Sequence, residues 1–425
     1  MFKDLDLKLN NENSKNITKA FFVLFLFAFI LRLIISVGYF NSFDTYWYRN
    51  WAIGTQNGIF DLYLNKDVNL DYPPIYVLFL SVTGFFYRFV GNTAAHDYVQ
   101  MLLMKSWPVI FDMLASIVIF KFSKKHGSCS ELFASALWLL SPAGIFNSSF
   151  WGQTDGLMCL LLLLSFWLLE KNPVLASVMF AVSGLTKFQC LYFTPVFLFI
   201  LFYRYKFKKF LLGIIFAALT VFIVFLPFMI ACNKPLLFFE VYLNGSGSYP
   251  YCTLNAFNFY GIFGLNWVEE TTPLFFGINY SHINILITVL IIVGILLLLY
   301  FGKNKCPYIA SLLTIEALFM FTTRMHERYQ FVALIFALIC FVIYKSKDFL
   351  RLFILLNIII TINQVVPMFD WQKGGSFLGG SNYSVIMSIV SILNLLLFIY
   401  CAYVCIKFIK GSEGECLLAQ ENESF

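Results

Sequence analysis

Charged residues are scarce in this sequence, since Asp, Glu, Lys and Arg together make up 12% of its 425 residues, against roughly 25% in soluble domains. A chain with so few charges cannot cover a water-soluble fold of this size with polar groups, which excludes that class. The ten cysteines lie mostly within apolar segments and have no paired spacing, so a disulfide scaffold is not expected, not even between Cys232 and Cys252 in one predicted loop. The sequence also lacks a convincing internal repeat, and the inverted-repeat architecture of many secondary transporters therefore has no support.

Long apolar runs are what the sequence has instead. Apolar residues make up 60% of the chain, and residues 20–30, 211–226 and 283–300 are nearly uninterrupted by polar side chains. A helix needs about 20 such residues to cross a hydrocarbon core of about 30 Å. The sequence therefore predicts an all-α polytopic membrane protein, organised as one transmembrane domain.

The basic residues give the topology. The net charge of +6 comes from short Lys and Arg clusters beside the apolar runs, and such clusters face the cytoplasm. No small-residue cleavage site follows the first apolar run, so we expect a retained first helix and not a signal peptide. About twelve transmembrane helices, with both termini inside, satisfy all clusters. They are expected near residues 20–40, 106–120, 131–147, 155–169, 174–186, 190–203, 211–230, 282–302, 307–323, 329–345, 349–365 and 384–406.

The connecting segments are unequal in length. This assignment leaves long outer loops at residues 41–105, 231–281 and 366–383, and a cytoplasmic tail at 407–425. Residues 75–90 are apolar enough to span, but a span there would move every later basic cluster to the wrong side. We therefore expect an interfacial or re-entrant helix at 75–90.

Asp44 lies in the first of five polar motifs that this topology places on the outer side. Phe43, Trp47 and Trp51 recur at intervals of four residues, which indicates an amphipathic helix with an aromatic face at the membrane interface. The plainer alternative is that Asp44 only caps this helix.

Asp71 and Tyr72 form the second motif, followed by two prolines. The prolines favour a rigid entry to the helix expected at 75–90. The turn holds Asp71 as a second outer carboxylate.

The third motif, at residues 149–156, carries Trp151, Gln153 and Asp155. A tight turn needs none of these, whereas an indole, an amide and a carboxylate are the groups that bind sugars. The alternative is an ordinary turn in which Asp155 caps the next helix.

Cations dominate the last two motifs. Lys187 and Gln189 lie where two short spans meet, and a cation there is costly unless it meets an anion. Residues 323–329 carry three potential cations, Arg324, His326 and Arg328, around Glu327. An Arg–Glu–Arg network is the plainer interpretation, and a bound phosphate the functional one.

Single charges within the predicted spans carry less weight. Arg32, Asp112 and Glu316 are expected to pair with one another inside the bundle.

The motifs, in this order, resemble the bacterial membrane mannosyltransferases related to the second GPI mannosyltransferase, and more distantly the endoplasmic-reticulum glucosyltransferases that extend lipid-linked oligosaccharides. The resemblance covers residues 44–329, and its most specific parts are Trp-Gly-Gln-Thr-Asp at 151–155 and Met-His-Glu-Arg-Tyr at 325–329. Both families belong to the GT-C class, which takes sugars from dolichyl- or polyprenyl-phosphate. The resemblance implies a catalytic base in the first outer loop, at Asp44, and a Pro-Pro helix along the membrane. Residues 44–46 read Asp-Thr-Tyr and not Asp-x-Asp, so neither a metal nor a cofactor is expected.

The predicted function is inverting transfer of a hexose, mannose or glucose, on the non-cytoplasmic face. Asp44 is the expected base, with Asp71 or Asp155 as the next candidates. The expected phosphate ligands are Lys187, Arg324, His326 and Arg328. The candidates for binding sugar or acceptor are Trp47, Asp71, Tyr72, Trp151, Gln153, Asp155, Gln189 and Glu327.

The expected partners are a polyprenyl-phosphate sugar, a glycan or lipid-linked acceptor and membrane lipid, without nucleic acid. High Phe, Ile, Asn and Lys usage favours a bacterial plasma membrane over the endoplasmic reticulum. A lipid-linked-sugar flippase or other transporter, and an assembly subunit without catalysis, are the alternatives.

Overall fold

Helices account for nearly all regular structure in the protein. The computed structural model describes residues 2–38, 43–68, 70–91, 97–126, 131–375 and 378–411. The strands within these residues are limited to β1 (Pro273–Phe275) and β2 (Ile278–Asn279), a two-residue-turn hairpin. The expected all-α fold class is confirmed.

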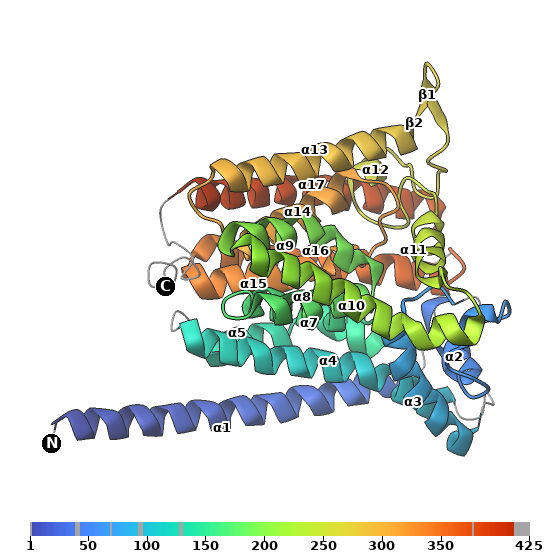
Figure 1. Ribbon diagram of the computed structural model, residues 1–425. Helices are drawn as coiled ribbons and strands as arrows, with labels where there is room; N and C mark the ends of the chain where they lie inside the picture. Colours follow the sequence, from blue (N-terminus) through green and yellow to red (C-terminus); the bar gives the residue numbers. More distant parts are fainter. Residues whose placement is uncertain are drawn as a thin grey trace.

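The first half of the chain contains the elements up to α10 (Figure 1). They are α1 (Phe2–Val37), α2 (Phe43–Gly54), η1 (Leu62–Leu64), α3 (Pro74–Val90), α4 (Asp97–His126), α5 (Glu131–Leu139), α6 (Pro142–Ile145), η3 (Phe146–Trp151), α7 (Asp155–Leu168), α8 (Pro173–Gly184), η4 (Phe188–Phe193), α9 (Thr194–Arg204) and α10 (Phe207–Cys232).

The second half completes the bundle. It consists of α11 (Leu237–Gly247), α12 (Phe259–Ile262), the hairpin, α13 (Tyr280–Phe301), α14 (Pro307–Phe321), η5 (Tyr329–Val332), α15 (Ala333–Tyr344), α16 (Lys347–Gln372) and α17 (Gly380–Lys410). The start of α1 and the end of α17 lie at the same end of the bundle, opposite α2, α3 and α11 (Figure 1).

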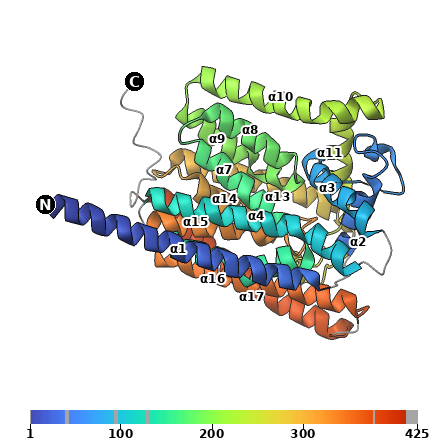
Figure 2. The same cartoon turned by 90° about the horizontal axis from the view of Figure 1, so that it is seen from below.

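The burial pattern fits a lipid environment. Residues 307–320 of α14 and 333–342 of α15 are all buried at the centre. Helix α10, at the edge of the bundle in Figure 2, exposes a stripe of large apolar side chains, and so does α13. The stripes are Ile215, Phe216, Leu219, Phe222, Ile223 and Leu226 on α10, and Ile285, Leu286, Val289, Leu290 and Val293 on α13. Apolar surfaces of this extent indicate a membrane protein.

Within the described residues, six helices are long and apolar enough to cross a membrane. They lie at Lys15–Val37, Asp97–His126, Phe207–Cys232, Tyr280–Phe301, Lys347–Gln372 and Gly380–Lys410. The other expected spans correspond to shorter or interrupted helices, so the count of twelve crossings stays a prediction.

Several predicted bounds need correction. Helix α4 begins at Asp97 and not near residue 106, so Lys105, predicted to close the first loop, is a buried helical residue whose Nζ donates to the Gly38 carbonyl at 3.1 Å. The span expected at 131–147 is broken, because Pro142 starts a new helix that Ser141 caps. Helix α16 runs on to Gln372, through Pro367, into the predicted third outer loop. The predicted second outer loop, 231–281, contains α11, α12 and the hairpin. Residues 412–425 of the predicted tail lie outside the described residues.

The buried charges do not form one group of three. The Arg32 guanidinium pairs with the Asp112 carboxylate at 2.8 Å and donates to Ser148 Oγ at 2.7 Å. Glu316 instead accepts two hydrogen bonds from Gln330, each of 3.1 Å. Cys232 and Cys252 are both free, as expected.

Helix α3 packs closely on α2 through a glycine. Its buried face includes Tyr76, Leu80 and Gly84, while Leu78 and Phe85 are among the apolar residues on its exposed face. Helix α3 therefore has apolar residues on both faces and lies at the end of the bundle where α2 and α11 lie (Figure 1), and the interfacial or re-entrant position expected for it stays a prediction.

The contact at Gly84 gives a first prediction. A Cβ there would lie 2.1 Å from the Ala52 carbonyl oxygen, which is backbone and cannot rotate away. We expect Gly84→Ala to push α3 from α2 and to destabilise the protein by about 1–3 kcal/mol, measured by thermal unfolding in detergent. Gly294→Ala in α13 is the matched control, since a Cβ there meets nothing within 4 Å. Equal stability of the two variants would contradict this packing.

Candidate functional site

A cavity of about 500 Å³ lies at the end of the bundle formed by α2, α3 and α11, a volume within the range of small-molecule sites. Its walls come from α2, the segment before α3, the end of η3, the start of η4, the loop after α11, residues 326–329 and the end of α16. Ten of the thirteen predicted site residues line it. They are Asp44, Trp47, Asp71, Tyr72, Trp151, Lys187, Gln189, His326, Glu327 and Arg328.

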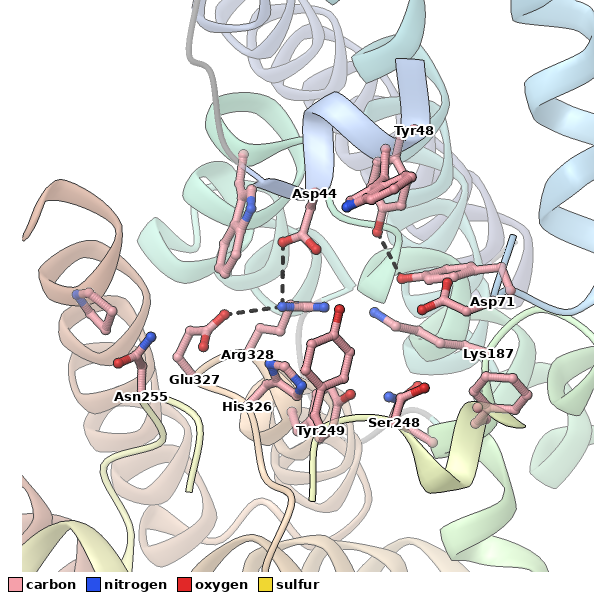
Figure 3. A pocket seen from close by; sticks show the side chains of 18 of the residues that line it. Asp44, Tyr48, Asp71, Lys187, Ser248, Tyr249, Asn255, His326, Glu327 and Arg328 are labelled. Atoms are coloured by element: carbon pink, nitrogen blue, oxygen red, sulfur yellow. Dashed lines mark hydrogen bonds and ion pairs between the residues drawn. The ribbon is translucent and has the colours of Figure 1, made fainter. Parts of the chain in front are cut away.

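Arg328 lies at the centre of the cavity, between two carboxylates (Figure 3). One Nη of Arg328 is 3.1 Å from Glu327 and 3.5 Å from Asp44. The guanidinium also lies 5.3 Å from the centre of the Trp151 indole ring, within cation–π range. Asp44 is therefore part of this centre and does more than cap α2, and the predicted Arg–Glu–Arg network is replaced by an Asp–Arg–Glu one.

Gln153 lies outside the cavity and holds the Asp44 carboxylate by a hydrogen bond. Its Nε2 donates to Asp44 Oδ2 at 2.8 Å, and its Oε1 accepts from the Tyr48 hydroxyl at 3.0 Å. Tyr48 in turn lies 2.8 Å, oxygen to oxygen, from the Tyr72 hydroxyl. Gln153 is fully buried and does not line the cavity, so its predicted contact with a sugar is corrected to a positioning role.

Lys187 and Asp155 form a second buried ion pair. The other oxygen of Asp155 accepts from Asn147 Nδ2 at 2.9 Å, so both oxygens of this carboxylate are engaged by protein groups. Burial acts to lower the pKa of Lys187, but Asp155 more than offsets it and the pKa is raised. Asp155 does not line the cavity, which corrects its predicted role as a sugar ligand and removes it as an alternative base.

The Arg324 side chain does not line the cavity. Its Nε donates to Glu270 at 3.0 Å, and the neighbouring Thr323 hydroxyl donates to the same carboxylate at 2.7 Å. The left-handed backbone at Arg324, with φ of 61°, turns its side chain to Glu270 while residues 326–328 face the cavity. The prediction of Arg324 as a phosphate ligand does not fit this placement.

Burial also shifts the pKa values of three other ionisable groups that line the cavity. Burial raises the pKa of Glu327 to about 7, against the opposing effect of Arg328. Burial and the neighbouring Asp44 raise the pKa of Asp71 to about 6. Burial and Arg328 lower the pKa of His326 well below its ordinary value, so this imidazole is neutral at pH 7. His326 can offer a hydrogen bond to a phosphate but not the positive charge that the sequence suggested.

Four buried polar atoms at the cavity make no hydrogen bond within the described part of the protein. They are Asp71 Oδ1, Trp151 Nε1, Gln189 Oε1 and Arg328 Nε. Unpaired buried donors and acceptors are costly and rare in folded proteins. A polar ligand in the cavity gains hydrogen bonds at these atoms.

Sequence reasoning missed part of the wall. Gly245 comes from the last turn of α11, and Ser248, Tyr249, Asn255 and Trp267 come from the segment between α11 and the hairpin. Pro367, Met368 and Trp371 come from the end of α16. The Tyr, Asn and Gly content of residues 231–281 was the available signal, but it named no single residue.

Among the described residues, no group of three His, Cys, Asp or Glu side chains is close enough to hold a metal ion. No family model and no curated protein matches the chain. A carboxylate, a guanidinium and an ammonium face one cavity with indole and phenol rings, an arrangement suited to a ligand that combines an anion with a sugar.

Proposed function

We propose that this protein is a membrane glycosyltransferase that takes a hexose from a polyprenyl-phosphate carrier and transfers it, with inversion, on the non-cytoplasmic face. The observation that carries the proposal is the position of Asp44 beside Arg328 in a cavity that Lys187 also lines. Transfer of a sugar from a phosphate carrier requires a base and fixed cations within one cavity.

The distribution of basic residues indicates on which side of the membrane the cavity lies. With the basic clusters in the cytoplasm, α2 and α3 lie at the opposite surface of the membrane. A polyprenyl chain held in the bilayer brings its phosphate to that surface, at the depth of the cavity. The proposed location is a bacterial plasma membrane.

The cations act on the leaving group. As the bond between the anomeric carbon and the phosphate oxygen breaks, its electron pair moves to the phosphate, and Arg328 and Lys187 stabilise the added charge. Arg328 has an unpaired Nε for this contact, and its Nη groups exchange a carboxylate for a phosphate oxygen.

Asp44 acts on the acceptor. Its carboxylate takes the proton of an acceptor hydroxyl while that oxygen forms the new bond to the anomeric carbon, and polyprenyl phosphate leaves on the opposite side. Such a base contributes about 10²–10⁴-fold to the rate. Gln153 fixes the orientation of this carboxylate through its hydrogen bond of 2.8 Å.

A flippase for lipid-linked sugars is the second candidate. The observation in its favour is the buried Arg32–Asp112 pair, which places charge within the bundle away from the cavity. Purified protein in vesicles containing labelled polyprenyl-phosphate hexose separates the two. We expect label to move to a glycan acceptor, whereas intact donor crossing the bilayer without transfer would support the flippase.

The pKa of Glu327 predicts a pH dependence of donor affinity. Below its pKa of about 7 this carboxyl is neutral, so the cavity becomes less negative as the pH falls from 8 to 6, and Arg328 is freed for phosphate. We expect the donor KM to fall over this range, by at most about tenfold per pH unit for one linked proton.

Glu327→Gln is the matched variant, because glutamine is neutral throughout. The donor KM of this variant should stay near the low value that the wild type has at pH 6, and it should change little between pH 6.5 and 8. A wild-type pH profile that survives this substitution would rule out Glu327 as its source.

A further inference from the structure

Part of the cavity is not used by the donor contacts described above. Asn255 and Lys187 lie on opposite sides of Arg328, with Glu327 between Asn255 and Arg328 (Figure 3). Asn255 is joined to α16 by a hydrogen bond of 2.7 Å from Asn363 Nδ2 to the Asn255 carbonyl oxygen. This side of the cavity is therefore built by the segment after α11 and by α16.

The side-chain amide of Asn255 is held in one orientation. Its Oδ1 accepts from Asn266 Nδ2 at 2.9 Å, from the Tyr383 hydroxyl at 2.9 Å and from Trp267 Nε1 at 3.3 Å. An indole nitrogen can only donate, so the oxygen must face Trp267. The Nδ2 group then lies away from these three donors and has no hydrogen-bond partner among the described residues. Asn255 lines the cavity, and its Nδ2 group is thus a hydrogen-bond donor in a fixed orientation.

Trp267 supplies a flat apolar surface beside this donor. Its indole is fixed by the bond to Asn255 and by an edge contact with Tyr251, yet its side chain remains 49% exposed and lines the cavity. An aromatic face next to a fixed polar donor matches a sugar, which has an apolar C–H face and hydroxyl groups at its edge.

The backbone of this segment is also strained. Tyr249 and Trp267 both have φ of 59°, in the left-handed region that bulky residues avoid. Backbone bonds hold this geometry, among them Trp267 N to the Thr253 carbonyl at 3.0 Å. Residues kept in such conformations cluster at ligand sites, because surrounding contacts must offset their cost.

We propose that Asn255 and Trp267 form the acceptor subsite and bind a saccharide. The inference rests on the proposed function and adds the substrate class of its second substrate. An acceptor bound here approaches the anomeric carbon from the side away from Lys187, as inversion requires. Asn255 Nδ2 donates to a ring hydroxyl, and the Trp267 indole packs on the ring face.

Two rates measured on the same vesicles test this subsite. With polyprenyl-phosphate mannose and polyprenyl-phosphate glucose as donors, release of free sugar reports transfer to water, and methyl mannoside or methyl glucoside at rising concentration reports transfer to a saccharide. Asn255→Asp keeps an oxygen for the three donors but removes the Nδ2 donor. We expect its saccharide KM, measured at saturating donor because the new carboxylate also lowers donor affinity, to rise about five- to tenfold, as for one lost hydrogen bond. Release to water at saturating donor should fall by less than transfer to the saccharide.

Trp267→Ala should raise the saccharide KM at least as much. Phe263→Ala is the control, since this side chain is exposed on the same segment but does not line the cavity. An unchanged saccharide KM in both cavity variants, or an equal loss of both rates, would overturn the subsite.

A binding measurement keeps the subsite testable without catalysis. If the wild type neither releases nor transfers sugar, the proposed function fails, but saturation-transfer NMR with the same methyl glycosides in nanodiscs still tests the subsite. Glycoside binding that disappears in Asn255→Asp and Trp267→Ala but persists in Phe263→Ala supports it. No glycoside binding by the wild type, or equal binding by all four proteins, refutes it.

Discussion

Replacing Asp44 with asparagine is expected to reduce sugar transfer by at least about 10²-fold, the usual effect of removing a general base. Asparagine has the same shape and can keep the hydrogen bond of 2.8 Å that Gln153 makes to Asp44. The fold should therefore change little, and the loss should fall on kcat. The donor KM should not rise, because Arg328 loses one of its two carboxylate partners. Steady-state transfer by purified protein in vesicles measures both quantities.

Asp67→Asn is the control for this prediction. Asp67 is an exposed carboxylate between α2 and α3 that does not line the cavity, so its loss should leave transfer unchanged. If Asp44→Asn retains full kcat, Asp44 is not the base, and Asp71 becomes the candidate because it faces the same cavity.

Replacing Arg328 with glutamine is expected to affect both activity and stability. Transfer should fall about 10²–10³-fold, because the leaving phosphate loses its central cation. The protein should also lose roughly 3 kcal/mol of stability, since Asp44 and Glu327 then face each other without the guanidinium between them. Thermal unfolding in detergent and the transfer assay measure the two effects separately.

A double variant distinguishes the structural role of Arg328 from its catalytic one. Adding Glu327→Gln to Arg328→Gln removes one of the two unpaired carboxylates, so the unfolding temperature should recover toward the wild type. Transfer should remain lost, because the cation is still missing. Recovery of transfer together with stability would show that Arg328 serves only to hold the fold.

The sequence identified the Asp, Glu, Lys, Arg and His residues that line the cavity, because such residues are costly in a membrane and need a local reason. Lys187 and Arg328, between apolar segments, are of this kind, and each meets a carboxylate. The sequence did not reveal which carboxylate each would meet. Arg324 and Arg328 lie four residues apart in one motif, yet a left-handed backbone at Arg324 directs it to Glu270.

The unpredicted part of the site depends on tertiary contacts. Asn255 is one of many asparagines in the chain, and its role depends on three donors from Asn266, Trp267 and Tyr383, the last of which is 128 positions away. No local pattern encodes such a set. Trp371 and Met368 reach the cavity because α16 continues through Pro367, where hydropathy alone ended the helix near 365.

The helical class and the approximate positions of the helices followed from hydropathy, since long apolar runs leave few other structures in a bilayer. Helix ends and interruptions did not. The 3-10 turns η4 and η5, each leading into an α-helix, hold Gln189 and Tyr329 at the cavity wall. Such turns depend on how neighbouring segments pack, and average hydropathy does not detect them.

The position of the donor phosphate tests the central proposal most directly. A cryo-EM structure of the protein in nanodiscs with a polyprenyl-phosphonate hexose, which cannot be cleaved at the anomeric bond, locates that group. We expect the phosphonate within hydrogen-bond distance of Arg328 and Lys187, with the sugar ring beside Asp44. A phosphonate bound outside this cavity, with Arg328 still paired to Asp44 and Glu327, would contradict the proposal.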